Sequence, residues 1–210
     1  DGNFSNHTVF QKYVNDSNNN LDLVNCDKIR GRSAELGGDC TNFLPSDNTY
    51  QAVVNVPGKL NLDITYLRNT LNYDINDEYS LVWLLGYEDM ERSSAQDSEV
   101  GLDPWDGATY LLDGTGAESF STELQIQSDE YGDFIWIAGI NYFHERTKTL
   151  GYYDNPMDDK AFWDQPDRST DALALFGQGT YNLTEKLHLT LGYRFSDETK
   201  EDKGGKTYRC

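Results

Sequence analysis

The chain has 210 residues and a formal net charge of −19, from 36 acidic and 17 basic side chains. This charge excludes binding to nucleic acid through a basic surface that neutralises phosphates. The longest apolar run, Phe134–Ile140, is too short for a transmembrane helix, which needs about 20 apolar residues.

The composition favours strands. The sequence contains 14 Tyr, 9 Phe, 4 Trp and 18 Gly, and long amphipathic helical patterns are few. The mean hydropathy of −0.70 is low. A β-barrel hides its membrane signal, however, because only alternate residues of each strand face lipid. Low hydropathy is therefore compatible with a membrane protein.

The N-terminal stretch, residues 1–55, is rich in Asn, Asp, Ser and Gly and has no sustained apolar period, which predicts a long surface loop. Within it, Cys26 and Cys40 are expected to form a disulfide if the compartment is oxidising, and Cys210 is left over. The first residues lack the basic and apolar regions of a signal peptide. We interpret both ends of the sequence as cuts through a longer polypeptide.

The first strand is expected from about Leu60 to Ile75. Its apolar residues change phase near Leu67, which predicts a β-bulge at that point. After the turn Asn76–Glu78, a second strand carries apolar residues at alternate positions, with aromatic residues at both ends of the stripe. That placement is typical of the aromatic girdles of membrane barrels. The stripe consists of Tyr79, Leu81, Trp83, Leu85 and Tyr87.

Four further strands follow in chain order, separated by polar, Gly-rich or acidic connections at about 94–117 and 150–168. Together the patterns predict an all-β fold of six long antiparallel strands in three hairpins, over about residues 60–200. The four strands are expected to begin at Phe120, Phe134, Thr170 and Leu187.

Short turns alternate with long connections along the chain. Tyr73–Leu81 is similar to Tyr181–Leu189, with an aromatic residue, an aliphatic residue, three polar turn residues and a new alternating run. Tight turns at one end and long loops at the other are typical of the two ends of a membrane β-barrel. The acidic loops are either solvated, or they bind divalent cations that bridge the loops to each other or to anionic lipid head groups.

No catalytic centre is indicated, so we do not expect an enzyme. His144–Glu145 lacks the second histidine of a metalloprotease pattern, and Asp113–Gly116 has no second copy such as an aspartic-protease loop requires. The dispersed His and Cys residues argue against a metal site, and no cofactor is indicated. Aromatic loop residues can either stack on a sugar ring or metal chelate, or pack the loops together. They are Tyr110, Tyr152, Tyr153 and Trp163.

Several consecutive segments resemble barrel hairpins of the TonB-dependent outer-membrane receptors. Glu118–Asp129 followed by Phe134–Phe143 resembles one hairpin, and Thr170–Thr184 leading into Leu189–Phe195 resembles the next. Each motif alone is weak, but their order over about residues 55–200 is fairly specific. The chain shows no segment like the N-terminal plug, no TonB box and no terminal barrel strand. The resemblance therefore implies an internal piece of the barrel wall.

The resemblance also implies a bacterial outer-membrane location and a parent barrel of about 22 strands around a plug. Such receptors import scarce ligands, such as ferric siderophores, cobalamin or oligosaccharides, with energy from the TonB complex acting through the plug. The expected partners are outer-membrane lipid, that complex and a small ligand. The long loops would be extracellular and the tight turns periplasmic.

Two other functions remain open on sequence grounds. One is a secreted β-sandwich module that binds carbohydrate with its loop aromatics, and the other is the wall of a non-specific porin. A sandwich would seal the apolar stripes beneath a second layer, whereas a barrel would leave them facing lipid. The stripes in question contain Leu81, Trp83, Leu189 and Leu191.

Overall fold

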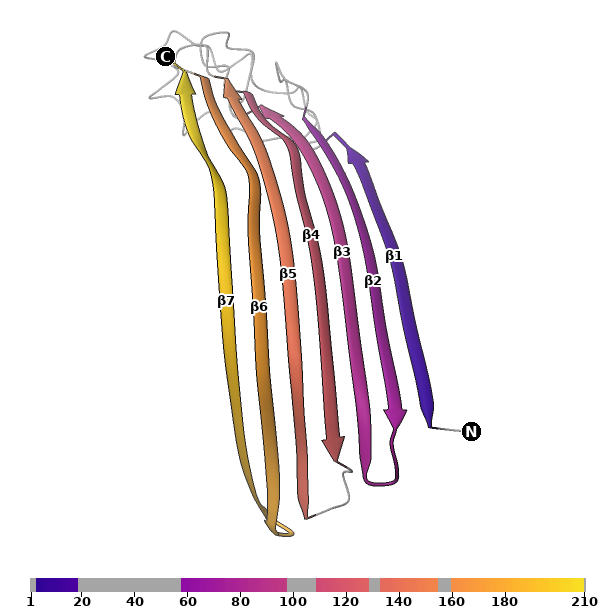
Figure 1. The fold of residues 1–210 in the computed structure, drawn as a ribbon. Helices are drawn as coiled ribbons and strands as arrows, with labels where there is room; N and C mark the ends of the chain where they lie inside the picture. The colour runs from indigo at the N-terminus through magenta and orange to yellow at the C-terminus, as the bar shows by residue number, and fades with distance from the viewer. Residues whose placement is uncertain (1–2, 19–57, 98–108, 129–132, 155–159, 210) are drawn as a thin grey trace, which may run out of the picture.

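The chain folds into one antiparallel sheet of seven strands, numbered and paired in sequence order (Figure 1). The computed structural model describes residues 3–18, 58–97, 109–128, 133–154 and 160–209. This part of the chain contains no helix long and apolar enough to cross a membrane. The strands are β1 (Phe4–Ser17), β2 (Lys59–Asp74), β3 (Tyr79–Asp97), β4 (Thr109–Ser128), β5 (Phe134–Asp154), β6 (Lys160–Thr184) and β7 (Leu187–Arg209).

The β2–β3 and β6–β7 turns lie at one end of the sheet, which we call the turn end, and we call the opposite end of the strands the loop end (Figure 1). In the β2–β3 turn, Asn76 Oδ1 accepts hydrogen bonds from the backbone N–H groups of Glu78 and Tyr79, both at 2.9 Å. In the β6–β7 turn, Thr184 Oγ1 accepts from the N–H of Leu187 at 3.0 Å. Short polar side chains that bond nearby N–H groups stabilise tight turns, as the repeated sequence pattern predicted.

The expected count of six strands is wrong, because a seventh strand lies within the predicted N-terminal loop. Phe4–Ser17 pairs with β2 along its whole length, from Phe4 opposite Tyr73 to Ser17 opposite Leu60. The other strands extend further toward the loop end than predicted, so that β4 begins at Thr109 and β7 continues to Arg209. The extension of β7 is polar on both faces, and a strand without an apolar stripe lacks the alternation on which the prediction depends. The extension of β4 contains Tyr110, Leu111 and Leu112, but it lies in a polar, Gly-rich stretch that favoured a loop.

The bulge predicted near Leu67 is absent. Residues Lys59–Asp74 keep a continuous register with β3, so the change of phase has another cause. Leu62 and Ile64 are apolar on one face near the loop end, whereas Leu71 and Tyr73 are apolar on the other face near the turn end. The irregularities in register lie elsewhere, mostly toward the loop end, as between Arg92 and Ser94 of β3.

The two faces of the sheet differ sharply. From the turns to the loop-end bulges of β2–β7, every exposed large apolar side chain lies on one face, as the registers show. We call this the apolar face and the opposite one the polar face. The exposed residues are Leu67, Tyr73, Tyr79, Trp83, Tyr87, Phe120, Leu124, Phe134, Ile140, Tyr142, Leu173, Leu175, Tyr181, Leu189, Leu191, Tyr193 and Phe195.

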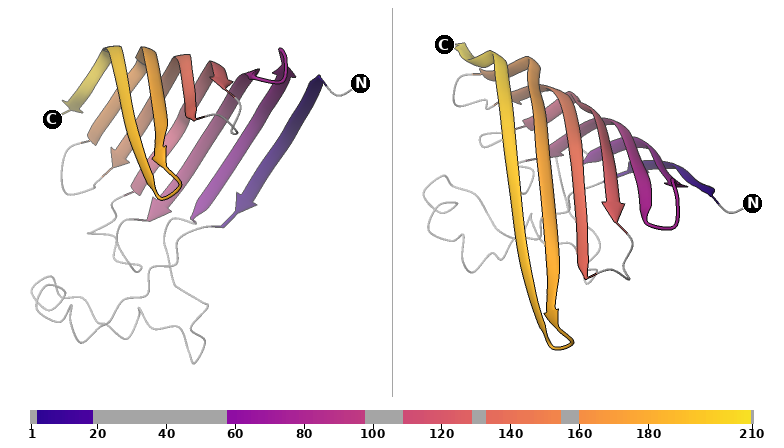
Figure 2. Two further views of the ribbon diagram at one scale, coloured as in Figure 1. Left: turned by 90° about the horizontal axis from the view of Figure 1, so that it is seen from below. Right: turned by 60° about the horizontal axis from the view of Figure 1, so that its bottom comes forward.

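The described part of the chain is a single twisted layer without a packed core (Figure 2). Ala174 is the one buried apolar residue among the described positions, at 2% exposure. Trp83 is 42% exposed and Leu191 is 71% exposed, so no second layer of described residues covers these stripes. The β-sandwich alternative is therefore wrong for this part of the chain.

Candidate functional site: a two-faced strand wall

Two rows of aromatic residues border the apolar face. At the turn-end border, the rings of Tyr79 and Trp136 meet across β4, with centroids 6.1 Å apart. At the other border, Phe120 of β4 contacts Tyr142 of β5, with centroids 6.5 Å apart. Tyr79 and Tyr87 are eight residues apart on β3, about 27 Å along a strand and about 20 Å in height at the usual barrel tilt. This height is close to that of the apolar band of a membrane barrel.

Polar groups within this band are paired. The indole Nε1–H of Trp83 donates to Thr122 Oγ1 on the adjacent strand, at 2.8 Å. An unpaired N–H in hydrocarbon would cost several kcal/mol, on the order of 2–7. The cross-strand bond lets a tryptophan occupy this exposed position without that cost.

A charged belt lies on the apolar face just beyond the aromatic row nearer the loop end. Tyr142 donates its hydroxyl to Asp171 at 2.9 Å, and Tyr87 donates to Glu118 at 3.2 Å, which links the aromatic row to the belt. Within the belt, cross-strand ion pairs join Lys12 to Asp63 (3.0 Å), Lys148 to Glu91 (3.6 Å), and both Arg146 (2.8 Å) and Lys203 (3.4 Å) to Asp167.

Asp167 is the shared acceptor of this belt. The hydrogen bond from Arg146 is the main cause that holds the pKa of the Asp167 carboxyl below its ordinary value, and Lys203 adds to it. Such a change from apolar to charged residues along one face marks the height at which the surroundings change from hydrocarbon to water and head groups.

The middle of the polar face carries amides, hydroxyls and a carboxylate, beside apolar residues such as Val82 and Leu84 of β3. Glu123 accepts hydrogen bonds from Asn141 at 3.1 Å and from Gln125. Gln127 Nε2 donates to Ser80 Oγ at 3.0 Å. A face of this chemistry suits a water-filled or plugged lumen rather than lipid.

Toward the loop end, the polar face carries an aromatic and apolar patch with two arginines. Tyr13, Ile64 and Met90 lie side by side across β1, β2 and β3. Tyr66 and Arg68 follow Ile64 on the same face of β2, toward the turn end. The guanidinium carbon of Arg68 lies 5.6 Å from the ring centroid of Tyr66. This separation is within the range of a cation–π interaction. We call these five residues, with Arg92, the inner patch.

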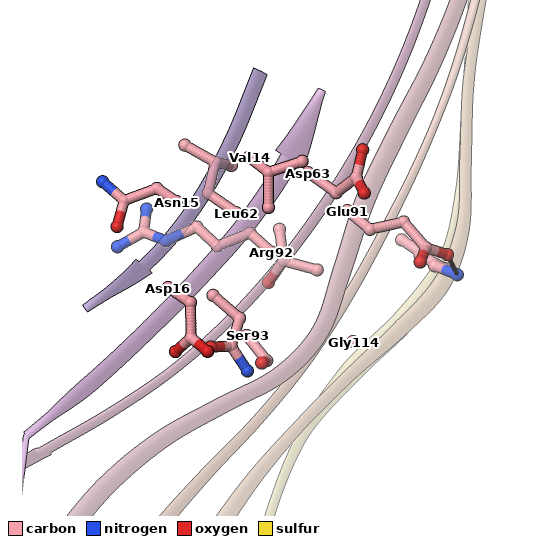
Figure 3. A pocket seen from close by; sticks show the side chains of 12 residues that line it. Val14, Asn15, Asp16, Leu62, Asp63, Glu91, Arg92, Ser93 and Gly114 are labelled. Carbon is pink, nitrogen blue, oxygen red and sulfur yellow. Dashed lines mark ion pairs between the residues drawn. The ribbon is translucent and has the colours of Figure 1, made fainter. Parts of the chain in front are cut away.

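A hollow of about 450 Å³ lies at the loop ends of β1–β4, and its lining includes Asp63, Glu91 and Lys148 of the charged belt (Figure 3). Asn15, Leu62 and Arg92 line it and lie opposite one another on successive strands. Thr115, which pairs with Arg92, also lines it, and its Oγ1 is shielded from solvent without a hydrogen-bond partner among the described residues. The lining thus combines two cations, three carboxylates and an unpaired hydroxyl, contributed from both faces of the sheet.

The sequence-predicted aromatic residues lie in strand ends rather than in loops, which corrects the predicted boundaries. Tyr110 of β4 pairs with Tyr153 of β5, and Trp163 of β6 pairs with Gly151 of β5. Tyr152 is half-buried and pairs with Leu111 and Phe162. The backbone therefore brings the four aromatics to neighbouring strands at the loop end. The side chains of Tyr110, Tyr153 and Trp163, and both Cys26 and Cys40, lie outside the described residues.

The inner patch was not predicted from sequence, although its signal was present. Tyr66 and Arg68 follow Leu62 and Ile64 at alternate positions, and all four share one face once the bulge at Leu67 is removed. Among the described residues, no group of three or more His, Cys, Asp or Glu side chains is arranged to hold a metal ion.

Comparison with known proteins gives two findings and one negative result. Residues 1–209 match a family described as "TonB dependent receptor-like, beta-barrel". The solved structure of the ferric yersiniabactin uptake receptor FyuA from Yersinia pestis has a similar fold, with a TM-score of 0.56 and 12% sequence identity over 74% of this chain. The similar region is 26% of that receptor, so the chain spans about a quarter of its length. No curated protein matches the sequence.

Proposed function

The chain belongs to the family of TonB-dependent receptor β-barrels, and from that premise we propose that it forms neighbouring strands in the wall of a bacterial outer-membrane receptor that imports a scarce ligand. The observation that supports this most strongly is the confinement of exposed apolar side chains on β2–β7 to one face. In such a wall, the apolar face contacts lipid and the polar face lines the lumen.

The orientation follows from the ends of the sheet. We propose that the turn end is periplasmic and the loop end extracellular, as short and longer connections are arranged in outer-membrane barrels. The strands continue well beyond the aromatic row nearer the loop end, by ten residues in β3 from Tyr87 to Asp97. This extension, about 33 Å of strand, would stand above the membrane as the wall of an external vestibule. The inner patch would lie at the base of this vestibule, because Arg68 pairs with Gly86 and Tyr66 with Glu88.

The ligand belongs to the class of small scarce nutrients, such as a metal chelate or an oligosaccharide. The inner patch supports this, because Tyr13 and Tyr66 offer aromatic faces beside Arg68 and Arg92. Aromatic faces bind sugar rings and the aromatic parts of chelates, and arginine pairs with carboxylate or phenolate oxygens. We retain the loop-end aromatics Tyr110, Tyr152, Tyr153 and Trp163 as further candidate contacts, and a Cys26–Cys40 disulfide as a constraint on the vestibule.

Energy for import would come from the TonB complex acting through the plug of the complete receptor. A porin wall needs no selective contacts, so ligand binding by the inner patch separates the two functions. Cells carrying the complete receptor with Arg92→Gln should bind its ligand several-fold more weakly than wild-type cells. Arg146→Gln is the matched control, because it removes the same charge from the apolar face. Equal binding by both variants would remove the inner patch from the ligand site.

A further inference from the structure

A groove lies in the apolar face, away from the loop and turn ends. It has a volume of about 420 Å³ and lies over β6, between Phe134 and Trp136 of β5 and Leu191 and Tyr193 of β7. Its floor is glycine: Gly179 pairs with Trp136 and Leu191, and Gly177 pairs with Tyr193. Two successive positions of β6 on the apolar face therefore carry no side chain, and the β5 partner of Gly177 is the small Ala138.

The floor is open at Gly177 and bounded at Gly179. A Cβ added at Gly177 would meet no atom closer than 3.6 Å, so nothing in the described protein fills that space. A Cβ at Gly179 would come within 2.8 Å of the Phe134 ring, which lies against this glycine. The Phe134 ring thus forms the turn-side edge of the groove, and the open part lies near the middle of the apolar band.

The position of the groove indicates its occupant. It is continuous with the surface that the proposed function places in lipid, and β5 and β7 are separated by two strand spacings, about 10 Å. This width admits one flexible hydrocarbon chain between the flanking side chains. Lipid tails are as apolar as the groove, so the attraction is not hydrophobic. It comes from dispersion contacts that an unfilled groove would lack.

The two charges of the β6–β7 turn, Glu185 and Lys186, fit the zwitterionic head group of a phospholipid such as phosphatidylethanolamine. Lys186 is the only Lys or Arg among the described residues of the β2–β3 and β6–β7 turns. From Leu187 to Tyr193 the strand rises six residues, about 20 Å along β7, which matches the reach of a phospholipid from its phosphate to the end of an acyl chain.

We propose that this groove holds one acyl chain of a phospholipid from the turn-side leaflet, with its phosphate near Lys186. The proposal rests on the membrane location assigned under the proposed function. The bound chain would cover the two glycines of β6 and complete the surface between Trp136 and Tyr193.

The test uses the complete receptor in phosphatidylethanolamine nanodiscs that contain a small fraction of a phospholipid with a diazirine at the end of one acyl chain. After irradiation, the labelled peptides are identified by mass spectrometry. Peptides containing Trp136 and Tyr193 should carry several-fold more label than the peptide containing Trp83. Gly177→Leu, which fills the open floor, should remove this excess, and Gly177→Ala should reduce it. Lys186→Glu should weaken it as well.

Gly205→Leu is the matched control, because a Cβ at Gly205 meets no atom within 4 Å and the position lies beyond the band. It should leave the labelling unchanged. Label spread evenly over the apolar face of the unsubstituted receptor would refute selective binding of an acyl chain in the groove, but not the contact of this face with lipid. No label on that face would overturn both.

Discussion

Trp83 and Thr122 are joined by a 2.8 Å hydrogen bond between adjacent strands in the middle of the apolar face. The bond satisfies the only polar group of a residue that is otherwise exposed on that face. In water such a bond would contribute little, because solvent would replace it. In hydrocarbon no replacement exists, so this pair reports directly on the surroundings of the apolar face.

Thr122→Val should therefore destabilise the complete barrel in lipid vesicles by about 1–3 kcal/mol, because it leaves the indole N–H of Trp83 without an acceptor. Equilibrium unfolding in urea measures the change. Thr190→Val removes a comparable bond, that of Thr190 to Thr180 at 2.9 Å, from the polar face. If Thr190→Val lowered the free energy of unfolding as much as Thr122→Val does, the assignment of the two faces would be contradicted.

Leu124 and Gln125 are neighbours in β4 that point to opposite faces. Leu124→Arg should cost about 2–4 kcal/mol of folding free energy in a bilayer, the range for a charge at the midplane of a barrel's lipid face. Gln125→Arg, which places the same charge on the polar face, should cost much less. Folding titrations in vesicles compare the two. A reversed order would mean that lipid contacts the polar face.

The β2–β3 turn depends on one side chain. Because Asn76 Oδ1 accepts two backbone N–H groups, Asn76→Ala should destabilise the hairpin by about 1 kcal/mol. Asp77→Ala, one residue along in the same turn, is the control and should have little effect. Thermal unfolding of both variants of the complete barrel in detergent distinguishes them, and an equal loss for the two would show that turn polarity alone matters.

The inner patch makes a separate prediction about ligand affinity. Tyr13→Ala should weaken ligand binding to the complete receptor several-fold, because it removes an aromatic surface beside Ile64 and Met90. Phe10 lies on the other face of β1, so Phe10→Ala, which also removes an aromatic ring, should not alter affinity. Calorimetric titration with the purified ligand provides the measurement. Unchanged affinity for Tyr13→Ala would move the ligand site elsewhere in the vestibule.

Alternation of apolar residues predicted the strands that cross the band, most clearly β7, in which one face is apolar and the other polar from Leu187 to Phe195. It failed in β1, where Asn6 and Thr8 interrupt the apolar positions between Phe4 and Phe10, and in β7 beyond Phe195, where neither face carries an apolar stripe. Alternation also gave a wrong prediction for β2. One face of this strand is apolar near the loop end and the other is apolar near the turn end, which produces the same change of phase as a bulge at Leu67. Strand pairing was needed to separate those two cases.

The candidate site was harder to predict than the fold. Tyr110 and Tyr153 were selected as aromatic residues of loops. Only the register shows that they are paired positions on the adjacent strands β4 and β5. The inner patch joins residues of β1, β2 and β3 that are far apart in sequence, from Tyr13 to Arg92. Its composition is ordinary in each segment, so the pattern exists only after the sheet is assembled.

The central claim is that the apolar face touches hydrocarbon, and spin-label accessibility along β7 of the complete receptor in a bilayer tests it most directly. Labels placed singly at Leu187–Phe195 should show high collision rates with oxygen at Leu189, Leu191 and Tyr193, and with a water-soluble nickel complex at His188, Thr190 and Gly192. The two profiles should alternate with a period of two and opposite phase. Water-soluble collisions that are equal at Leu191 and Thr190 would contradict the account.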